Sequence, residues 1–335
     1  MNLESTTSEL KHKWLAHLSD VSVQVGVMFA LLVGLVLLTG WWDPNFFTPY
    51  SRHSVLRDTA VWSLFALGQA VVIIGGGIDL SVGSLIAFFG VLTILMLNSG
   101  LPFPLVVLLI LLLAAAIGAI HGSLICGLHL QPFLVTLCSL LIFRGLARVI
   151  THDKTVSFNS SQQELFRELA TGSWGGLPIP VLILAGVLVP LGLLMHGTVP
   201  GRYIYAMGYN LEAARFSGVQ VNLLRTFCYA LCSVLTAMAA LLETGDVGSV
   251  SPSSAGLAYE MYGITGAVLG GCALRGGQGS LIGVVIGMTI LRVIKSAVVF
   301  LNFDTYWTFT VTGLVLLAAV IIDSVVRGRR TGYRH

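Results

Sequence analysis

Asp79 is the single charged side chain between residues 59 and 143, and it stands inside a glycine cluster. The segment reads Gly75-Gly76-Gly77-Ile78-Asp79-Leu80-Ser81-Val82-Gly83-Ser84. Three consecutive glycines do not continue a stable helix, because glycine loses the most conformational freedom on folding. A carboxylate just before a fresh apolar run is well placed as the N-cap of the helix that follows, and we favour that interpretation. The alternative is a contact with an ion or a substrate at a discontinuous helix.

The other residue types that could do chemistry form no constellation in this sequence. A Walker phosphate-binding loop needs a Gly-Lys pair, and none of the four lysines follows a glycine. His121 and His129 stand far from paired carboxylates, and we expect both to be polar residues at the membrane interface. The five cysteines lack the spacing of a metal site or a disulfide framework. The sequence therefore predicts no catalytic residue, no metal ligand and no bound cofactor, and it argues against an enzyme.

Composition indicates the environment that must position these residues. Hydrophobic residues make up 56% of the chain and charged residues 10%, well below the roughly 25% typical of soluble domains. Such a chain needs an apolar solvent, and each membrane span needs about 20 apolar residues. We expect an all-α integral membrane protein of about ten transmembrane helices with glycine-rich breaks. The expected spans are 21–40, 59–78, 80–97, 101–120, 131–150, 179–197, 225–242, 261–274, 280–301 and 305–323.

Lysine and arginine cluster before the first expected span, in the 198–224 connection, after the eighth span and at the end of the chain. With an even number of spans, all these clusters lie on the same side of the membrane. That side should be the cytoplasm. Acidic residues dominate the loops expected on the other side: Asp43, Asp58, Asp153, Glu164, Glu168, Glu243, Asp246, Glu260 and Asp304. Both termini are then expected inside and the loop 151–178 outside. The predicted divisions are a cytoplasmic segment 1–20, a membrane domain 21–323 with a cytoplasmic loop 198–224, and a basic cytoplasmic tail 324–335.

The longest predicted cytoplasmic connection contains a short helix signal. Asn210 can cap a helix that ends at Gly218. That helix would carry Glu212, Ala213, Ala214 and Arg215. Exposed aromatic and charged residues on a helix held between two spans suit docking to a soluble partner, but the residues alone favour a merely solvated loop.

A second glycine-rich turn follows the expected span 261–274. Gly83-Ser84-Leu85-Ile86 recurs as Gly279-Ser280-Leu281-Ile282, and a glycine stands eight residues before each copy, at Gly75 and Gly271. The two units could be halves of a weak internal repeat of the kind found in transporters. A match this short is equally compatible with coincidence.

The sequence resembles the permease subunits of bacterial ATP-binding cassette importers for ribose, xylose and arabinose. Residues 76–83 match the Gly-Gly-Ile-Asp-Leu-Ser-Val-Gly signature of that family without a gap. The signature turn is carried by Gly76, Gly77, Asp79, Ser81 and Gly83. The similarity extends through 131–137, 143–146, 201–219, 259–260 and 268–271.

The resemblance implies a role and a set of partners. The Glu212-Ala213-Ala214 segment resembles a coupling helix that fits a groove on the ATPase, which overturns the solvated-loop interpretation. The expected assembly contains a second permease subunit, identical or paralogous, a cytoplasmic ATPase that uses the ATP, and a periplasmic sugar-binding protein. The chain itself would lie in the bacterial inner membrane and bind no nucleic acid. The sugar cannot be read from the residues.

Arg292 and Lys295 depart from the paired asparagines common in ribose-type permeases. Three residues apart, they share a helix face, and Arg292 falls near mid-membrane, where a charge needs water or a partner. Pairing with Asp304 or reaching the outer headgroups suits Lys295 and suits Arg292 poorly. The sharper hypothesis is that Arg292 lines the translocation path, where it would favour an anionic or unusually hydroxylated sugar. Arg292 and Lys295 are therefore the candidate residues of that path. The main rival function is an ion-coupled secondary transporter using Asp79, and a membrane-embedded enzyme is a distant third.

Overall fold

The protein is mostly helical in a computed structural model that describes residues 25–159, 163–302, 304, 306–311, 313–315, 317 and 321. Within these residues, seven helices are long and apolar enough to cross a membrane. They are Val25–Trp42, α2 (Pro49–Ile74), α4 (Phe103–Gly127), α5 (Pro132–Thr151), α7 (Ile179–Gly192) continued by η2 (Leu193–Gly197), α10 (Val221–Val247) and α12 (Leu281–Phe300). The shorter elements are η1 (Pro44–Phe47), α3 (Val82–Asn98), α6 (Gln163–Thr171), α8 (Val199–Tyr209), α9 (Leu211–Phe216) and α11 (Tyr259–Leu269).

Two of the ten expected spans are too short to cross a bilayer alone. The 17 residues of α3 rise about 25 Å and the 11 residues of α11 about 16 Å, against a hydrocarbon core of about 30 Å. Extended or turn segments precede both helices, at 75–81 and 248–258. The expectation of broken helices is therefore confirmed, and that of ten full spans is confirmed only in part. The expected span 305–323 is described only with gaps, and the terminal segments 1–20 and 324–335 lie wholly outside the described residues.

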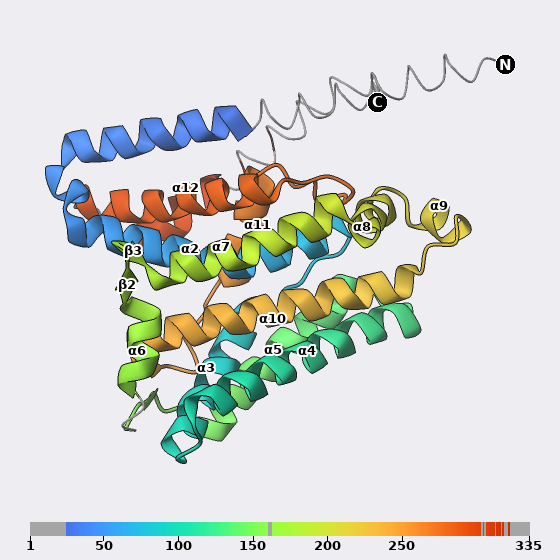
Figure 1. The fold of residues 1–335 in the computed structure, drawn as a ribbon, viewed down its shortest axis with the longest axis horizontal. Helices are drawn as coiled ribbons and strands as arrows, with labels where there is room; N and C mark the ends of the chain where they lie inside the picture. The colour runs from blue at the N-terminus through green and yellow to red at the C-terminus, as the bar shows by residue number, and fades with distance from the viewer. Residues whose placement is uncertain are drawn as a thin grey trace.

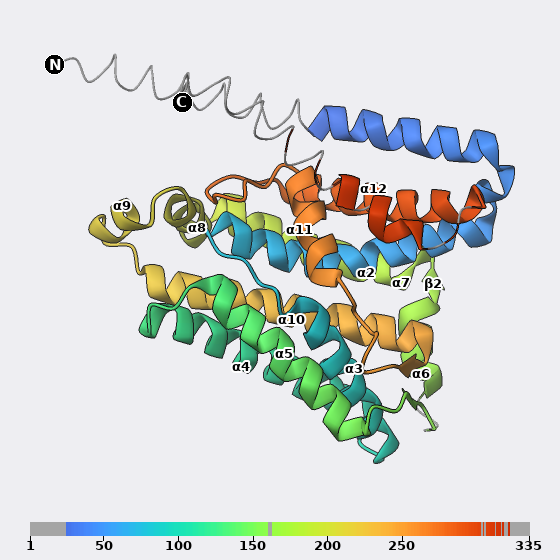
Figure 2. The same cartoon turned by 180° about the vertical axis from the view of Figure 1, so that it is seen from behind.

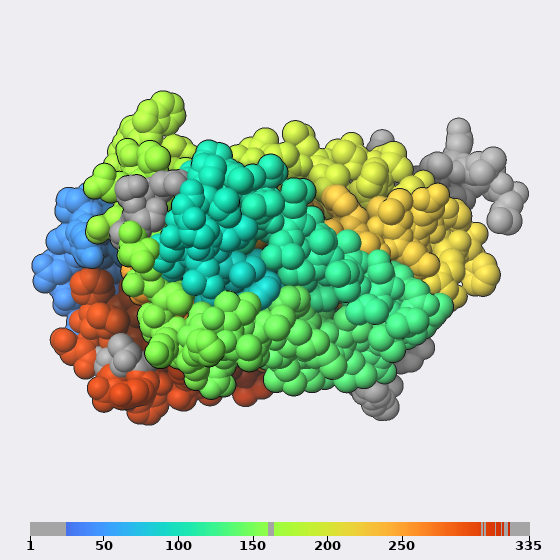
Figure 3. All heavy atoms as spheres, turned by 90° about the horizontal axis from the view of Figure 1, so that it is seen from below, coloured from blue at the N-terminus to red at the C-terminus, as the bar shows by residue number. Residues whose placement is uncertain are grey.

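The bundle is organised around α2 and α10. Most of α2 after its second turn is buried, and α10 packs against α2, α3 and α4. Figure 3 shows the face that α4 and α5 cover. Exposed apolar side chains on these two helices include Leu108, Leu112, Ile120, Leu141, Ile142 and Val149. An apolar outer surface around a buried, partly polar interior is what a lipid solvent requires.

The two ends of the bundle carry different structures (Figures 1 and 2). At one end, called the α9 end, lie α8, α9 and the turn between α11 and α12. At the other, called the α6 end, lie α6 and the hairpin of β2 (Ser173–Trp174) and β3 (Leu177–Pro178). There β1 (Val156–Ser157) pairs antiparallel with β4 (Ser249–Val250), which ties the loop 151–178 to the segment after α10.

The two glycine-rich breaks end their helices in the same way. Gly76 follows α2 with φ +79°, and its counterpart after α11 is Gly271, with φ +94°. In each break, the amide of this glycine and the next amide form the pair of hydrogen bonds of a Schellman motif. The accepting carbonyls are those of Ile73 and Val72 in the first break and of Val268 and Ala267 in the second. The two helices therefore end alike, but Gly271 matches Gly76 and not Gly75, so the structure does not support the register of the predicted repeat.

The shared Gly-Ser-Leu-Ile tetrapeptide does not follow this repeat. Ser84 lies inside α3, whereas Ser280 is the N-cap residue of α12 and accepts from the Gly283 amide. The two copies of the tetrapeptide thus occupy different positions relative to the helix that each one enters.

Candidate functional site

The short helix expected between 210 and 218 is present as α9. The Asn210 side chain accepts a hydrogen bond from the Ala213 amide at 3.0 Å, so it is the N-cap. Gly218 follows with φ +82°, the left-handed conformation that commonly ends a helix. Ala214 is buried, whereas Glu212, Ala213 and Arg215 are exposed. The helix therefore presents one polar face away from the bundle.

An exposed aromatic side chain stands at each end of α9: Tyr209 precedes the N-cap residue, and Phe216 is the last residue of the helix. Tyr209 is 79% exposed and Phe216 is 87% exposed. Arg215 lies 3.8 Å from Glu212, a surface ion pair of small energetic weight. This end thus exposes charged and aromatic side chains close together, and its docking role stays a prediction.

A junction of glycines connects α9 to the interior. We call Gly76, Gly208, Gly276 and Gly277 the glycine junction. The Gly277 amide donates to the Ile74 carbonyl at 2.8 Å, which joins the turn after α11 to the end of α2. A Cβ on Gly208 would overlap that same carbonyl and lie 2.6 Å from the Gly277 nitrogen. The backbones of α2, α8 and the second turn therefore touch without intervening side chains.

Asp79 occupies the centre of the signature turn and is wholly buried. Its Oδ1 accepts from the Ser81 amide at 2.8 Å and from the Ser81 hydroxyl at 2.6 Å. The expected N-cap interaction is corrected in one respect: α3 begins at Val82, so the N-cap residue is Ser81, which makes no side-chain cap bond. The carboxylate stabilises the turn before the helix. Its Oδ2 has no hydrogen-bond partner among the described residues.

Steric contacts explain why glycine is needed at two positions of the signature turn. A Cβ on Gly77 would lie 2.5 Å from the Tyr229 hydroxyl, which donates to the Ile78 carbonyl at 3.2 Å. A Cβ on Gly83 would overlap the Gly256 carbonyl, so the start of α3 touches the segment 248–258. The turn therefore contacts α10 on one side and the entry to α11 on the other.

His121 was expected at the membrane interface, and the structure contradicts this. The side chain is 3% exposed in α4, and its Nε2 lies 2.7 Å from the Ser139 hydroxyl of α5. A histidine inside an apolar helix remains there when a neighbouring helix supplies a hydrogen-bond partner. His129, by contrast, is exposed at the turn between the two helices.

Arg144 fixes the segment 248–258, a role for which the sequence carried no separate signal. Its guanidinium donates to the carbonyls of Pro252 at 3.0 Å and Ala255 at 2.6 Å, and to that of Gly83 at 3.3 Å. One side chain of α5 thus holds the segment against the start of α3. The planar, multi-donor guanidinium is suited to bridging several carbonyls.

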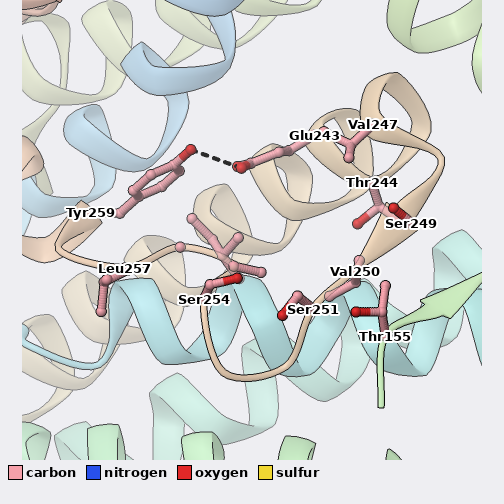
Figure 4. A pocket seen from close by; sticks show the side chains of 13 residues that line it. Thr155, Glu243, Thr244, Val247, Ser249, Val250, Ser251, Ser254, Leu257 and Tyr259 are labelled. Atoms are coloured by element: carbon pink, nitrogen blue, oxygen red, sulfur yellow. Dashed lines mark hydrogen bonds between the residues drawn. The ribbon is translucent and has the colours of Figure 1, made fainter. Parts of the chain in front are cut away.

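A cavity of about 260 Å³ lies against this segment (Figure 4). Its walls are formed by the end of α10, the segment 249–257, the start of α11, Ile86 and Thr155. Glu243 reaches in from α10, and its Oε1 accepts from the Tyr259 hydroxyl at 2.7 Å. Hydroxyl groups share the walls with apolar side chains, and they belong to Thr155, Thr244, Ser249, Ser251, Ser254 and Tyr259. The cavity can therefore form many hydrogen bonds with a small polar molecule.

Arg292 and Lys295 have other neighbours than the sequence suggested. The Arg292 guanidinium donates to Asp58 Oδ2 of α2, from Nε at 2.9 Å and from Nη2 at 2.5 Å, and to Ser296 at 3.1 Å. Lys295 Nζ lies 4.9 Å from the centre of the Trp62 ring, a cation–π contact. Neither residue lines the cavity of Figure 4. The role of Arg292 in a translocation path stays a prediction.

The acidic residues near Arg57, Arg292 and Lys295 were expected in outer loops, but several of them lie inside helices. Asp58 belongs to α2, and Glu243 and Asp246 belong to the last turns of α10, which extends past the expected end of that span. Asp246 pairs with Arg57 at 3.0 Å. Charge balance could have indicated these carboxylates from the sequence, because two cations in a predicted span need carboxylates nearby.

Comparison with known proteins gives a match along nearly the whole chain. The family model described as "Branched-chain amino acid transport system / permease component" matches residues 51–320. The Ribose import permease protein RbsC of Escherichia coli K12 is 36% identical over 298 residues, which are 89% of this chain and 92% of RbsC. RbsC of Bacillus subtilis 168 is 33% identical, covering 96% and 98% of the two chains. The Xylose transport system permease protein XylH of E. coli K12 is 30% identical, covering 93% and 94%. No solved structure matches.

Proposed function

Since this chain belongs to the permease component family of branched-chain amino acid transport systems, we propose that it forms the membrane path of an ATP-driven importer for a ribose-type monosaccharide. Its relatives are named as ribose import and xylose transport permeases, and they match most of its length. A permease is not an enzyme, so the free energy for uphill transport must come from a partner subunit. The chain is a multi-pass membrane protein similar to RbsC, and we place it in a bacterial inner membrane.

The observation that carries this proposal is an exposed, capped helix joined to the interior through backbone contacts. When a partner ATPase closes on ATP, it would displace α9 together with α8. The glycine junction would pass that displacement to the end of α2 and to the turn before α12. Because packed backbones without flexible side chains deform little, the motion would reach the signature turn. The break at 75–81 then lets α3 move relative to α2, which biases the permease between inward-open and outward-open states.

The proposal includes a specific assembly and orientation. A second permease subunit, identical or paralogous, would complete the path, and a cytoplasmic ATPase would bind α9. A periplasmic sugar-binding protein would deliver the solute at the opposite end. In support, α9 and the loop 151–178 lie at opposite ends of the bundle, as this orientation requires (Figure 1). The α9 end would then face the cytoplasm and the α6 end the periplasm.

An ion-coupled secondary transporter is the rival, since Asp79 is a buried carboxylate with an unpartnered oxygen among the described residues. An ion site needs several oxygen ligands converging on the carboxylate. The free carboxylate oxygen and the family membership point in different directions, and the family match over most of the chain weighs more.

The test is uptake in proteoliposomes that contain this permease with its cognate ATPase and binding protein. We expect uptake of labelled ribose or xylose that requires ATP on the ATPase side. Asn210→Ala removes the helix cap, a loss of about 1 kcal/mol, and should lower uptake several-fold with normal protein levels. Asn210→Asp keeps a capping oxygen and serves as the matched control. Uptake driven by an ion gradient without ATP would refute the proposal.

A further inference from the structure

We infer that the cavity beside Glu243 is a solute site for an uncharged, hydroxyl-rich molecule, and that Glu243 determines its selectivity. The inference rests on the proposed function and assigns it a location and a charge preference. It also differs from the expectation raised by Arg292, which favoured an anionic or unusually hydroxylated sugar. Four observations carry it: the orientation of Glu243, the hydroxyl lining, the size of the cavity and its charge.

Glu243 is held with one oxygen occupied and one free. The Tyr259 hydroxyl donates to Oε1 at 2.7 Å, while Oε2 is buried and has no partner among the described residues. The Tyr259 ring is fixed in turn, stacked on Phe65 at 5.3 Å and tilted against Trp62 at 5.6 Å. A buried acceptor without a partner is costly, so a solute hydroxyl that reached Oε2 when the site opens would recover most of that cost.

The rest of the lining suits hydroxyl groups. Thr155, Thr244, Ser251 and Ser254 can each donate and accept, and they come from three separate segments around the cavity. The volume of about 260 Å³ lies just below the roughly 300 Å³ at which pockets for drug-sized ligands begin. A monosaccharide is therefore a better match than a disaccharide or a large nucleoside derivative.

The charge of the cavity disfavours anions. The described residues that line it include one carboxylate and neither lysine nor arginine. The cations nearby are already engaged: Arg57 pairs with Asp246, Arg292 pairs with Asp58, and Lys295 lies over Trp62. An anionic sugar would place its charge in a site whose described lining offers no compensating cation, which is unfavourable.

The cavity lies where a movement of α3 could change its wall. Its roof is the segment 249–257, and Arg144 links this segment to Gly83 at the start of α3. A movement of α3 would therefore act on the roof of the site. This gives the signature turn a direct route to the solute.

The first experiment asks whether sugars occupy the cavity, and it does not depend on transport. Ser254→Cys in the full-length permease in nanodiscs provides a thiol in the lining, and the parent chain measures the background from the exposed Cys138. We expect ribose, xylose or galactose to slow maleimide labelling of the new thiol. Galacturonate, which carries a carboxylate in place of the galactose hydroxymethyl group, should need at least about a tenfold higher concentration. Equal protection by galacturonate, or no protection by any neutral sugar, would overturn the inference.

The second experiment tests Glu243 itself in the same reporter background. Glu243→Leu removes the acceptor and should raise the sugar concentration for half-protection about tenfold or more. Glu243→Gln keeps a hydrogen-bond acceptor without an ionisable group. It should raise the half-protection concentration of neutral sugars less than Glu243→Leu does, and it should reduce the difference between that concentration and the one for galacturonate. Glu168→Gln, on the exposed face of α6, is the matched control and should change neither value. If both Glu243 variants behave like this control, Glu243 does not determine selectivity.

The two proposals fail separately. A reconstituted importer without ATP-dependent sugar uptake would refute the proposed function, whatever the labelling result. An importer that works normally while Ser254→Cys is unprotected and Glu243→Leu leaves the uptake KM unchanged would refute only the site.

Discussion

The two ends of the bundle hold themselves together by different means. At the α9 end, backbones meet directly at the glycine junction, and a Cβ on Gly208 or Gly276 would collide with backbone atoms. At the α6 end, apart from the short β1–β4 pairing, contacts run through charged and hydroxylated side chains, including Arg292 with Asp58 and Glu243 with Tyr259. Backbone contacts have one arrangement, whereas side-chain networks have alternative partners. The first suits the transmission of a displacement, and the second suits a region that opens around a solute.

The difference predicts that small substitutions at the α9 end are the most disruptive. Gly208→Ala should lower stability by about 3 kcal/mol or more, because neither the Ile74 carbonyl nor the Gly277 amide can move away as a side chain would. The measurement is the temperature at which the detergent-solubilised protein stops eluting as a single species. The matched control is Gly186→Ala in α7, where nothing described lies within 4 Å of the added carbon. Equal behaviour of the two variants would contradict the contrast between the ends.

At the α6 end, removal of one charge should cost an intermediate amount. Asp58→Asn leaves Arg292 without its anion, and we expect a loss of about 2 kcal/mol, less than the roughly 3–5 kcal/mol for a fully buried pair. The reason is that the Asp58 side chain is 25% exposed. The double variant Asp58→Asn with Arg292→Met should recover part of this loss, as a thermal-unfolding double-mutant cycle would reveal. Simple addition of the two single effects would mean that the pair is not coupled.

Lys295 should show the smallest of the three effects. Lys295→Met keeps an apolar stem beside Trp62 but removes the cation over the ring, for an expected loss of about 1 kcal/mol or less. Lys295→Arg retains a cation and should stay closer to the parent chain. The same unfolding measurement applies. A loss larger than that of Asp58→Asn would reverse the ranking and point to an ion-pair role for Lys295.

Local features near the chain's own glycines and caps were predictable from the sequence. The helix of Asn210 to Gly218 was predicted because its signals are local: an N-cap side chain and a left-handed glycine. The break at Gly75 followed from glycine chemistry for the same reason. The start of α3 was misjudged by two residues, because the Asp79 carboxylate accepts from the Ser81 amide within the turn and the helix begins only after Ser81.

The sequence by itself determined that this is a helical membrane protein with broken helices and a short capped helix between two spans, since each follows from composition or from neighbours in the chain. Only the tertiary structure decided the partners of charges far apart in sequence. Asp58 and Arg292 are 234 residues apart, and His121 meets Ser139 across two helices. The same holds for the cavity, which needs α3, α10 and α11 together. Hydrophobic patterning places helices in the membrane, but the rotation and pairing of those helices depend on packing between segments that the chain order does not specify.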